Sequence, residues 1–118
     1  MDKSFQYYVV SCSGASNTGK FSDEVARKFM KSGNVKMLCL ARFSIDKAWA
    51  EEAKKDIKNI IVLDGCPIHC AEKIMLEAGI TNYIHLKTTD FDIVKGKTPY
   101  SDEKANEIIE HIQKLMET

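Results

Sequence analysis

Apolar runs alternate along this chain with segments in which apolar residues recur at helical spacing. Short runs rich in aromatic and β-branched residues predict four strands, over Phe5 to Ser11, Val35 to Leu40, Asn59 to Leu63 and Asn82 to Leu86. The third run is almost wholly apolar, as is typical of a strand covered on both faces of a sheet.

The segments between these runs have the 3.6-residue period of amphipathic helices. The first carries Phe21, Ser22, Val25, Ala26, Phe29 and Met30, and Ser32-Gly33-Asn34 ends it. A second helix would bury Ile45, Ala48, Trp49 and Ala53. A third begins at Pro67 and stops before Gly79, and the last opens near Thr98-Pro99 and carries an apolar stripe from Ala105 to Met116. Lys87 to Lys97 fits neither pattern.

Strands that alternate with helices predict an α/β fold in a single domain spanning residues 1–118. We expect a three-layer, flavodoxin- or Rossmann-like open parallel sheet of about four strands in the order 2-1-3-4, with helices on both faces and right-handed crossovers. Ligands of such sheets bind beyond the carboxyl ends of the strands, where the strand order reverses.

The composition excludes several classes of function. The 118 residues include 17 basic and 17 acidic side chains, without a basic cluster, so we expect no nucleic-acid partner. No stretch approaches the roughly 20 apolar residues of a membrane span, and the polar start does not resemble a secretion signal. We therefore expect a cytoplasmic protein that does not enter membranes, in which cysteines act as thiols or metal ligands rather than as structural disulfides.

The four cysteines cluster at one predicted edge of the sheet. Cys12, Cys39 and Cys66 each lie at the carboxyl end of a predicted strand, and the position numbers differ by 27 from each cysteine to the next. The ends of neighbouring strands lie about 4.8 Å apart, so three such thiols can share one tetrahedral zinc with Zn–S bonds of about 2.3 Å. Cys70 follows Cys66 by four residues, which places both on one side of a helix that begins at Pro67. A redox pair of Cys66 and Cys70 and simple core packing are the alternatives.

Two other motifs fail on chemistry. Gly14 to Lys20 matches the G-x-x-x-x-G-K loop of P-loop nucleotidases, but Phe21 stands where a hydroxyl must bind magnesium. Thiol phosphatases need an arginine six residues after the cysteine, where this chain has Thr18. A milder prediction survives, in which the amides of the loop that contains Ser13 and Gly14 hold a small anion near the metal.

Further polar residues lie near the predicted thiols. Asp64 ends the third strand, where it could cap the turn through Gly65 or serve as an acid or base. His69 could replace Cys70 as a ligand or hydrogen-bond a sulfur, and His85 could line the rim of the same pocket. His111 lies on the last predicted helix, away from this edge.

These residues also resemble a known family. Cys12-Ser13-Gly14, the cysteine of Cys39-Leu40-Ala41 and the segment Asp64 to Ala71 are similar to the DGC-domain proteins, named for the central Asp-Gly-Cys. The resemblance covers nearly the whole chain and implies one zinc held by Cys12, Cys39, Cys66 and Cys70, in a family whose biochemical role is unassigned. Arg42-Phe43-Ser44 replaces the expected glycine-rich loop after Cys39, a departure that affects the shape of the pocket.

The residues leave two functional classes open. A closed four-thiolate site indicates a zinc-binding protein, and an incomplete site indicates a zinc- or thiol-dependent enzyme with redox or small-anion chemistry. The same thiols could hold an iron–sulfur cluster. The sequence assigns no catalytic residue and no organic cofactor.

Overall fold

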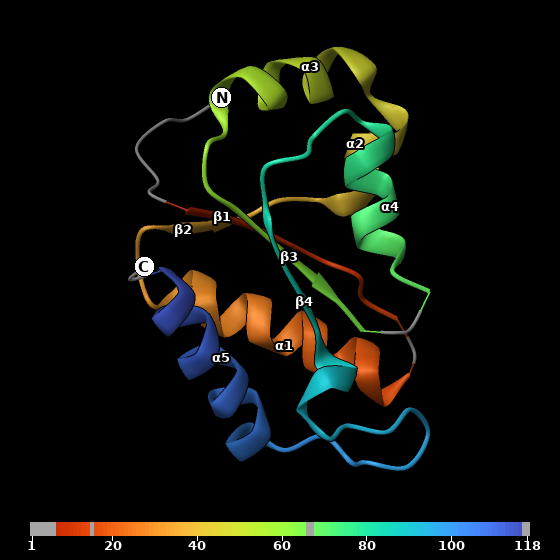
Figure 1. Cartoon of the computed structure of the whole chain (residues 1–118), viewed down its shortest axis with the longest axis vertical. Coiled ribbons are helices and arrows are strands. Elements are labelled where there is room, and N and C mark those ends of the chain that lie inside the picture. The colour runs from red at the N-terminus through yellow and green to blue at the C-terminus, as the bar shows by residue number, and fades with distance from the viewer. Residues whose placement is uncertain (1–6, 15, 66–67, 117–118) are drawn as a thin grey trace.

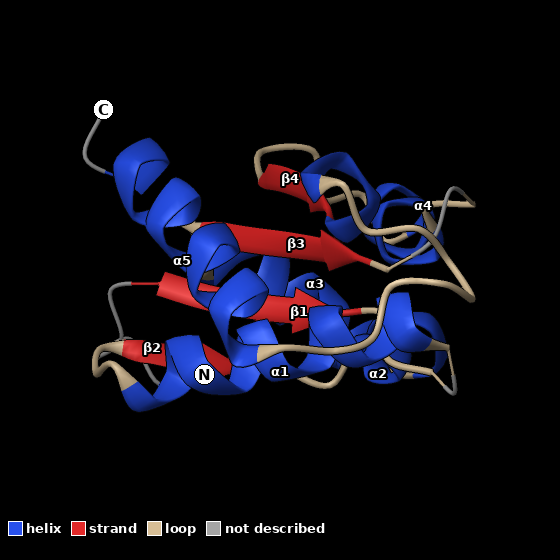
Figure 2. Ribbon diagram, turned by 90° about the horizontal axis from the view of Figure 1, so that it is seen from below, coloured by secondary structure: helices blue, strands red, loops and turns tan. Residues whose placement is uncertain are grey.

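A four-stranded parallel sheet forms the centre of the computed structural model, which describes residues 7–14, 16–65 and 68–116. The strands are β1 (Tyr7–Ser11), β2 (Val35–Met37), β3 (Ile60–Asp64) and β4 (Ile84–Lys87). Their order is β2-β1-β3-β4, and all neighbours pair in parallel. Figure 2 shows the strands side by side and pointing the same way. The predicted α/β fold and the 2-1-3-4 order are confirmed.

Helices cover both faces of this sheet (Figure 1). They are α1 (Asn17–Lys31), α2 (Leu40–Ile45), α3 (Lys47–Asp56), α4 (Cys70–Glu77) and α5 (Asp102–Met116), with a 3-10 turn η1 (Thr88–Phe91) in the segment that the sequence pattern left unassigned. Helices α1 and α5 pack on one face, and α2, α3 and α4 lie on the other. None of the described helices combines the length and the apolar character that a membrane span requires.

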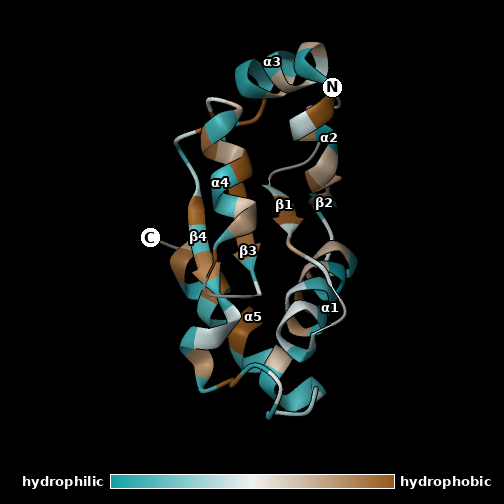
Figure 3. Cartoon of the chain, turned by 90° about the vertical axis from the view of Figure 1, so that its right-hand side faces the viewer, coloured by the Kyte–Doolittle hydropathy of each residue, from teal (hydrophilic) through white to brown (hydrophobic). Residues whose placement is uncertain are grey.

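Alternation along the strands divides the core into two clusters. Val9, Ile61 and Leu63 pack against α1 and α5, and Val10, Ile60 and Val62 pack against the opposite helices. In Figure 3 most of β1, β3 and β4 is hydrophobic, whereas α3 is largely hydrophilic. The central strand β3 is buried at every position, as its unbroken apolar run predicts.

The helix expected after β2 is two helices. Asp46 ends α2 and caps α3, because its Oδ1 accepts the Trp49 amide at 3.1 Å and its backbone leaves the helical region. The predicted inner face is wrong at Ile45, which is 82% exposed, and at Ala48, which is also exposed. Phe43, Ala50 and Ala53 are the buried residues of this region.

The helix expected from Pro67 begins at Cys70 instead. His69, directly before it, has a φ of 61° in the left-handed region, which a continuous right-handed helix cannot contain. Pro67 lies outside the described residues. The start at Cys70 removes the helical-spacing argument that placed Cys66 and Cys70 on one side of a first turn.

Candidate metal centre

Cys12 directly follows β1 on the side of the sheet that α2 and α4 cover. Its amide donates to the Leu63 carbonyl at 2.9 Å, which extends the pairing of β1 with β3 by one residue. Strand alternation puts Cys12 on the same face as Tyr8 and Val10, and its half-buried side chain packs against their cluster. Cys12 therefore lies at the predicted edge of the sheet.

Cys39 and Cys70 stand at the starts of two helices on that same face. Cys39 is the exposed N-cap residue of α2, and half-buried Cys70 is the first residue of α4. Leu38 and Ala71, their chain neighbours, are buried in the cluster that Cys12 contacts, and α2 contacts α4. Cys66 lies outside the described residues, so the four-cysteine site stays a prediction.

Close backbone contacts join the loop after β1, the start of α1 and the turn after β3. A Cβ built on Gly65 would lie 2.6 Å from the Thr18 oxygen and 2.8 Å from the Gly19 Cα. A Cβ on Gly19 would lie 2.8 Å from the Gly14 nitrogen. Only glycine permits such close approach, so the Asp-Gly turn after β3 packs directly on the start of α1. Main-chain atoms of Thr18 and Gly19, rather than side chains, therefore fix the position of Gly65.

The loop after β1 already uses several of its polar groups. The Ser13 hydroxyl donates to Asp23 Oδ1 at 2.9 Å, and the Gly19 amide donates to the Ser16 hydroxyl at 3.1 Å. Among the described residues, no atom beyond the chain neighbours of Gly14 lies within 4 Å of a Cβ built on it. The expected small anion near the metal stays a prediction, and the Asp23 carboxylate adds negative charge beside Ser13.

Asp64, at the end of β3, joins that strand to α4. Its side chain is completely buried; Oδ1 accepts the Ala71 amide at 2.7 Å and Oδ2 accepts the Glu72 amide at 3.1 Å. Amides at the second and third helical positions normally bond to the N-cap side chain, but His69 makes no such bond. Asp64 therefore caps α4, a role that the sequence did not indicate; the predicted cap of the turn through Gly65 and the predicted role as an acid or base stay predictions.

The same carboxylate also holds His85. Position 85 on β4 is in register with Val62, so the imidazole points to the face that carries Asp64. His85 Nε2 lies 2.7 Å from Asp64 Oδ2. Because both Asp64 oxygens accept amide protons, we assign Nε2–H as the donor in this bond.

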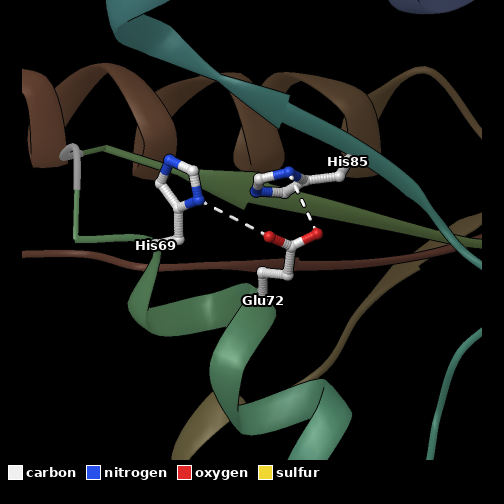
Figure 4. A group of neighbouring side chains, drawn as sticks. All are labelled: His69, Glu72 and His85. Atoms are coloured by element: carbon white, nitrogen blue, oxygen red, sulfur yellow. Dashed lines mark ion pairs between the residues drawn. The ribbon is translucent and has the colours of Figure 1, made fainter.

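Glu72 lies between two histidines (Figure 4). Its Oε2 is 3.4 Å from His85 Nδ1, and its Oε1 is 3.5 Å from His69 Nδ1. The two imidazole rings meet edge to face with centroids 5.3 Å apart. Within the described residues, His69, Glu72 and His85 form the group of ligand atoms close enough to hold one metal ion, all within 4.8 Å of one another.

Tyr83, which directly precedes β4, completes this network. Its hydroxyl donates to Glu72 Oε2 at 2.8 Å, and this bond is the largest cause that lowers the pKa of the Glu72 carboxyl. The adjacent histidines lower that pKa further, against the opposing effect of burial. Burial first, and then the bond to Glu72, raise the pKa of Tyr83 to about 12. Glu72 is thus a carboxylate and Tyr83 a neutral donor at ordinary pH.

The sequence indicated His69, His85 and Asp64 but not Glu72 or Tyr83. Tyr83 and His85 lie two residues apart within the strand predicted over Asn82 to Leu86, which is the signal that could have placed them on one face. Glu72 lies in the first turn of α4, where acidic residues are common. The packing of α4 on the sheet brings it to Tyr83 and His85.

Comparison with known proteins identifies similar sequences. The family model of the DGC domain matches residues 8–112. The anaerobic and virulence modulator AnvM of Pseudomonas aeruginosa is 25% identical over 87 residues, which are 74% of this chain and 66% of that protein. The chain thus spans just under two thirds of the length of this relative. The solved structures contain no match.

Proposed function

Because the chain belongs to the DGC domain family, we propose that it is a zinc-binding protein with a four-thiolate site at the carboxyl edge of its sheet. The ligands are Cys12, Cys39, Cys66 and Cys70. The observation that carries this proposal is the common location of the three described cysteines, at one edge and on one face of the sheet.

The donor set suits zinc. Cys39 and Cys70 are free thiols, and thiolates are the ligands that closed tetrahedral zinc sites prefer. A zinc ion held by four thiolates has no open position, so it organises the protein rather than reacting with a substrate.

A binding role is compatible with the name of the AnvM relative, which calls that protein a modulator. The topology also agrees, because the order β2-β1-β3 places the strand ends before Cys12 and Cys39 side by side. Gly65, at the end of β3, is fixed against α1 by main-chain contacts. Because this edge of the sheet is already ordered, metal binding has a smaller entropic cost.

Metal content and cobalt spectroscopy test the proposal. Protein purified under reducing conditions should carry about one zinc per chain, and cobalt in its place should show intense sulfur-to-cobalt charge-transfer absorption in the near ultraviolet. Cys39→Ser is the most informative variant, because Cys39 is exposed and its replacement leaves the core intact. We expect the variant to fold but to lose tight zinc binding and to weaken the charge-transfer band.

Two results would contradict the four-thiolate site. One is a folded protein that binds no metal and has four freely titrating thiols. The other is Cys39→Ser protein that keeps its zinc and its full charge-transfer band. Visible absorption by the purified protein without added cobalt would indicate that the thiolates bind an iron–sulfur cluster instead of zinc.

A further inference from the structure

His69, Glu72 and His85 present three metal-ligating atoms to one point beside the start of α4 (Figure 4). A tetrahedral ion with ligand bonds of about 2.0–2.1 Å holds its ligand atoms about 3.4 Å apart. The separations of 3.4 Å between His85 Nδ1 and Glu72 Oε2 and of 3.5 Å between His69 Nδ1 and Glu72 Oε1 are close to that length, and each histidine faces its own oxygen of the carboxylate. One ligand atom from each of the three residues lies within 4.8 Å of the other two.

The hydrogen bonds of His85 indicate which of its nitrogens can bind an ion at this point. Nε2–H donates to Asp64, so Nδ1 is the nitrogen that faces the Glu72 carboxylate, 3.4 Å from Oε2. The negative charge of that carboxylate attracts a cation to the space beside Nδ1. A histidine that binds metal through one nitrogen and donates from the other to a carboxylate is the usual arrangement of metal sites.

The backbone conformation of His69 is unusual for the residue that precedes a helix. Its φ of 61° and ψ of 47° lie in the left-handed region, and its side chain does not cap α4. A residue other than glycine in this region is uncommon, and such residues cluster at functional sites. The conformation places the imidazole beside Glu72, in the first turn of the helix.

We propose that His69, Glu72 and His85 form a second metal site, which binds Zn²⁺ or a similar divalent cation independently of the four cysteines. Two histidines and one glutamate form a ligand set of zinc sites that keep a fourth position for water or a small ligand. Asp64 orients His85, and Tyr83 orients Glu72. The side chains of His85, Glu72 and His69 are 17%, 26% and 30% exposed, so an ion can enter from solvent.

Cobalt titration of the metal-free, reduced full-length protein distinguishes this site from the thiolate site. We expect two equivalents of Co²⁺ to bind, the first with sulfur charge-transfer absorption and the second with only weak visible bands. The second site does not rest on the proposed function, because no cysteine provides its ligands. Failure of one site therefore leaves the spectrum of the other in place.

His85→Gln is the decisive variant. The glutamine amide can still donate to Asp64, but it offers no nitrogen in the place of Nδ1. We expect the affinity of the second site to fall by at least about 100-fold, more than the 10–100-fold typical of outer-shell changes. Glu72→Gln, which keeps an acceptor for Tyr83, should have the same effect. His111→Gln is the matched control, because His111 lies on α5, on the opposite face of the sheet.

Nitrogen-15 shifts of the imidazoles provide a reading that does not depend on affinity. Zn²⁺ should shift Nδ1 of His69 and His85 and leave both nitrogens of His111 unchanged. Uptake of a single equivalent that shows sulfur charge-transfer absorption would overturn the proposal in favour of a proton between these groups. Loss of that absorption in His85→Gln protein that melts normally would overturn it in favour of one mixed site.

Discussion

Replacement of Asp64 by asparagine tests whether this buried carboxylate holds α4 in place. Asparagine has the same shape, but it offers one oxygen where Asp64 offers two. If that oxygen takes the place of Oδ2, it can still accept from Glu72 and His85. Its amide nitrogen then faces the buried Ala71 amide, which loses its acceptor.

The expected loss of stability follows from these three bonds. A buried amide without an acceptor costs about 1–3 kcal/mol. The two bonds that remain lose the gain from a charged acceptor, about 1 kcal/mol each, and relief from the burial of charge offsets part of the sum. We expect the free energy of unfolding to fall by about 2–4 kcal/mol. Domains of this size shift by about 3–5 °C per kcal/mol, so the melting temperature should fall by roughly 10 °C.

Urea unfolding followed by circular dichroism measures this loss. The experiment is done with a chelator and reductant present, because a bound metal would add its own stabilisation to the folded state. Asp46→Asn is the matched control: Asp46 caps α3 through the Trp49 amide at a more exposed position, and asparagine is an equally good N-cap. If Asp64→Asn costs no more than Asp46→Asn, the cap from Asp64 does not stabilise α4.

Two further predictions concern other parts of the fold. Gly65→Ala should cost about 1–3 kcal/mol or more, since its Cβ meets the main chain of Thr18. Gly14→Ala should be nearly neutral, because among the described residues no atom beyond its chain neighbours lies within 4 Å of a Cβ at Gly14; melting curves compare the two variants. Tyr100→Phe should raise the pKa of Asp102, because the Tyr100 hydroxyl bond, ahead of the nearby Lys28, holds that pKa below 3.8. The stabilisation from ionised Asp102 is present above pH 3.8 and is lost as the pH falls through the folded-state pKa of Asp102. Tyr100→Phe protein should therefore lose this stabilisation at a higher pH than the unmodified protein. Carboxyl-carbon NMR titration measures the Asp102 pKa in both proteins, and equal values would contradict the prediction.

The sequence predicts the sheet well because its apolar runs are strong local signals. The apolar runs at β1 and β3 indicate buried strands. The alternation of strands and helices then predicts a parallel sheet and restricts the strand order. The break at Asp46 was missed because an N-capping aspartate inside an otherwise helical segment is a weak signal beside Trp49 and Ala53. The start of α4 was misplaced because Pro67 is a favourable first residue, whereas the conformation of His69 depends on contacts distant in sequence.

The candidate site was predictable only where chain position determines it. Cys12 lies at the edge of the sheet because it follows a strand. Glu72 and Tyr83 could not be assigned to the site, because their contact depends on how α4 packs on the sheet, which no spacing encodes. The cap from Asp64 on α4 was not predictable for the same reason, since its partners Ala71 and Glu72 are seven and eight residues away along the chain.

The cap from Asp64 makes two main-chain amides into natural reporters of the histidine cluster. The carboxylate that accepts the Ala71 and Glu72 protons also accepts from His85, so any change in the charge on that ring redistributes electron density over all three bonds. Amide proton shifts and exchange rates of Ala71 and Glu72 should therefore follow ligand binding at His85 without a label or an assay of activity. A single buried carboxylate thus couples the start of a helix to the chemistry on the neighbouring strand.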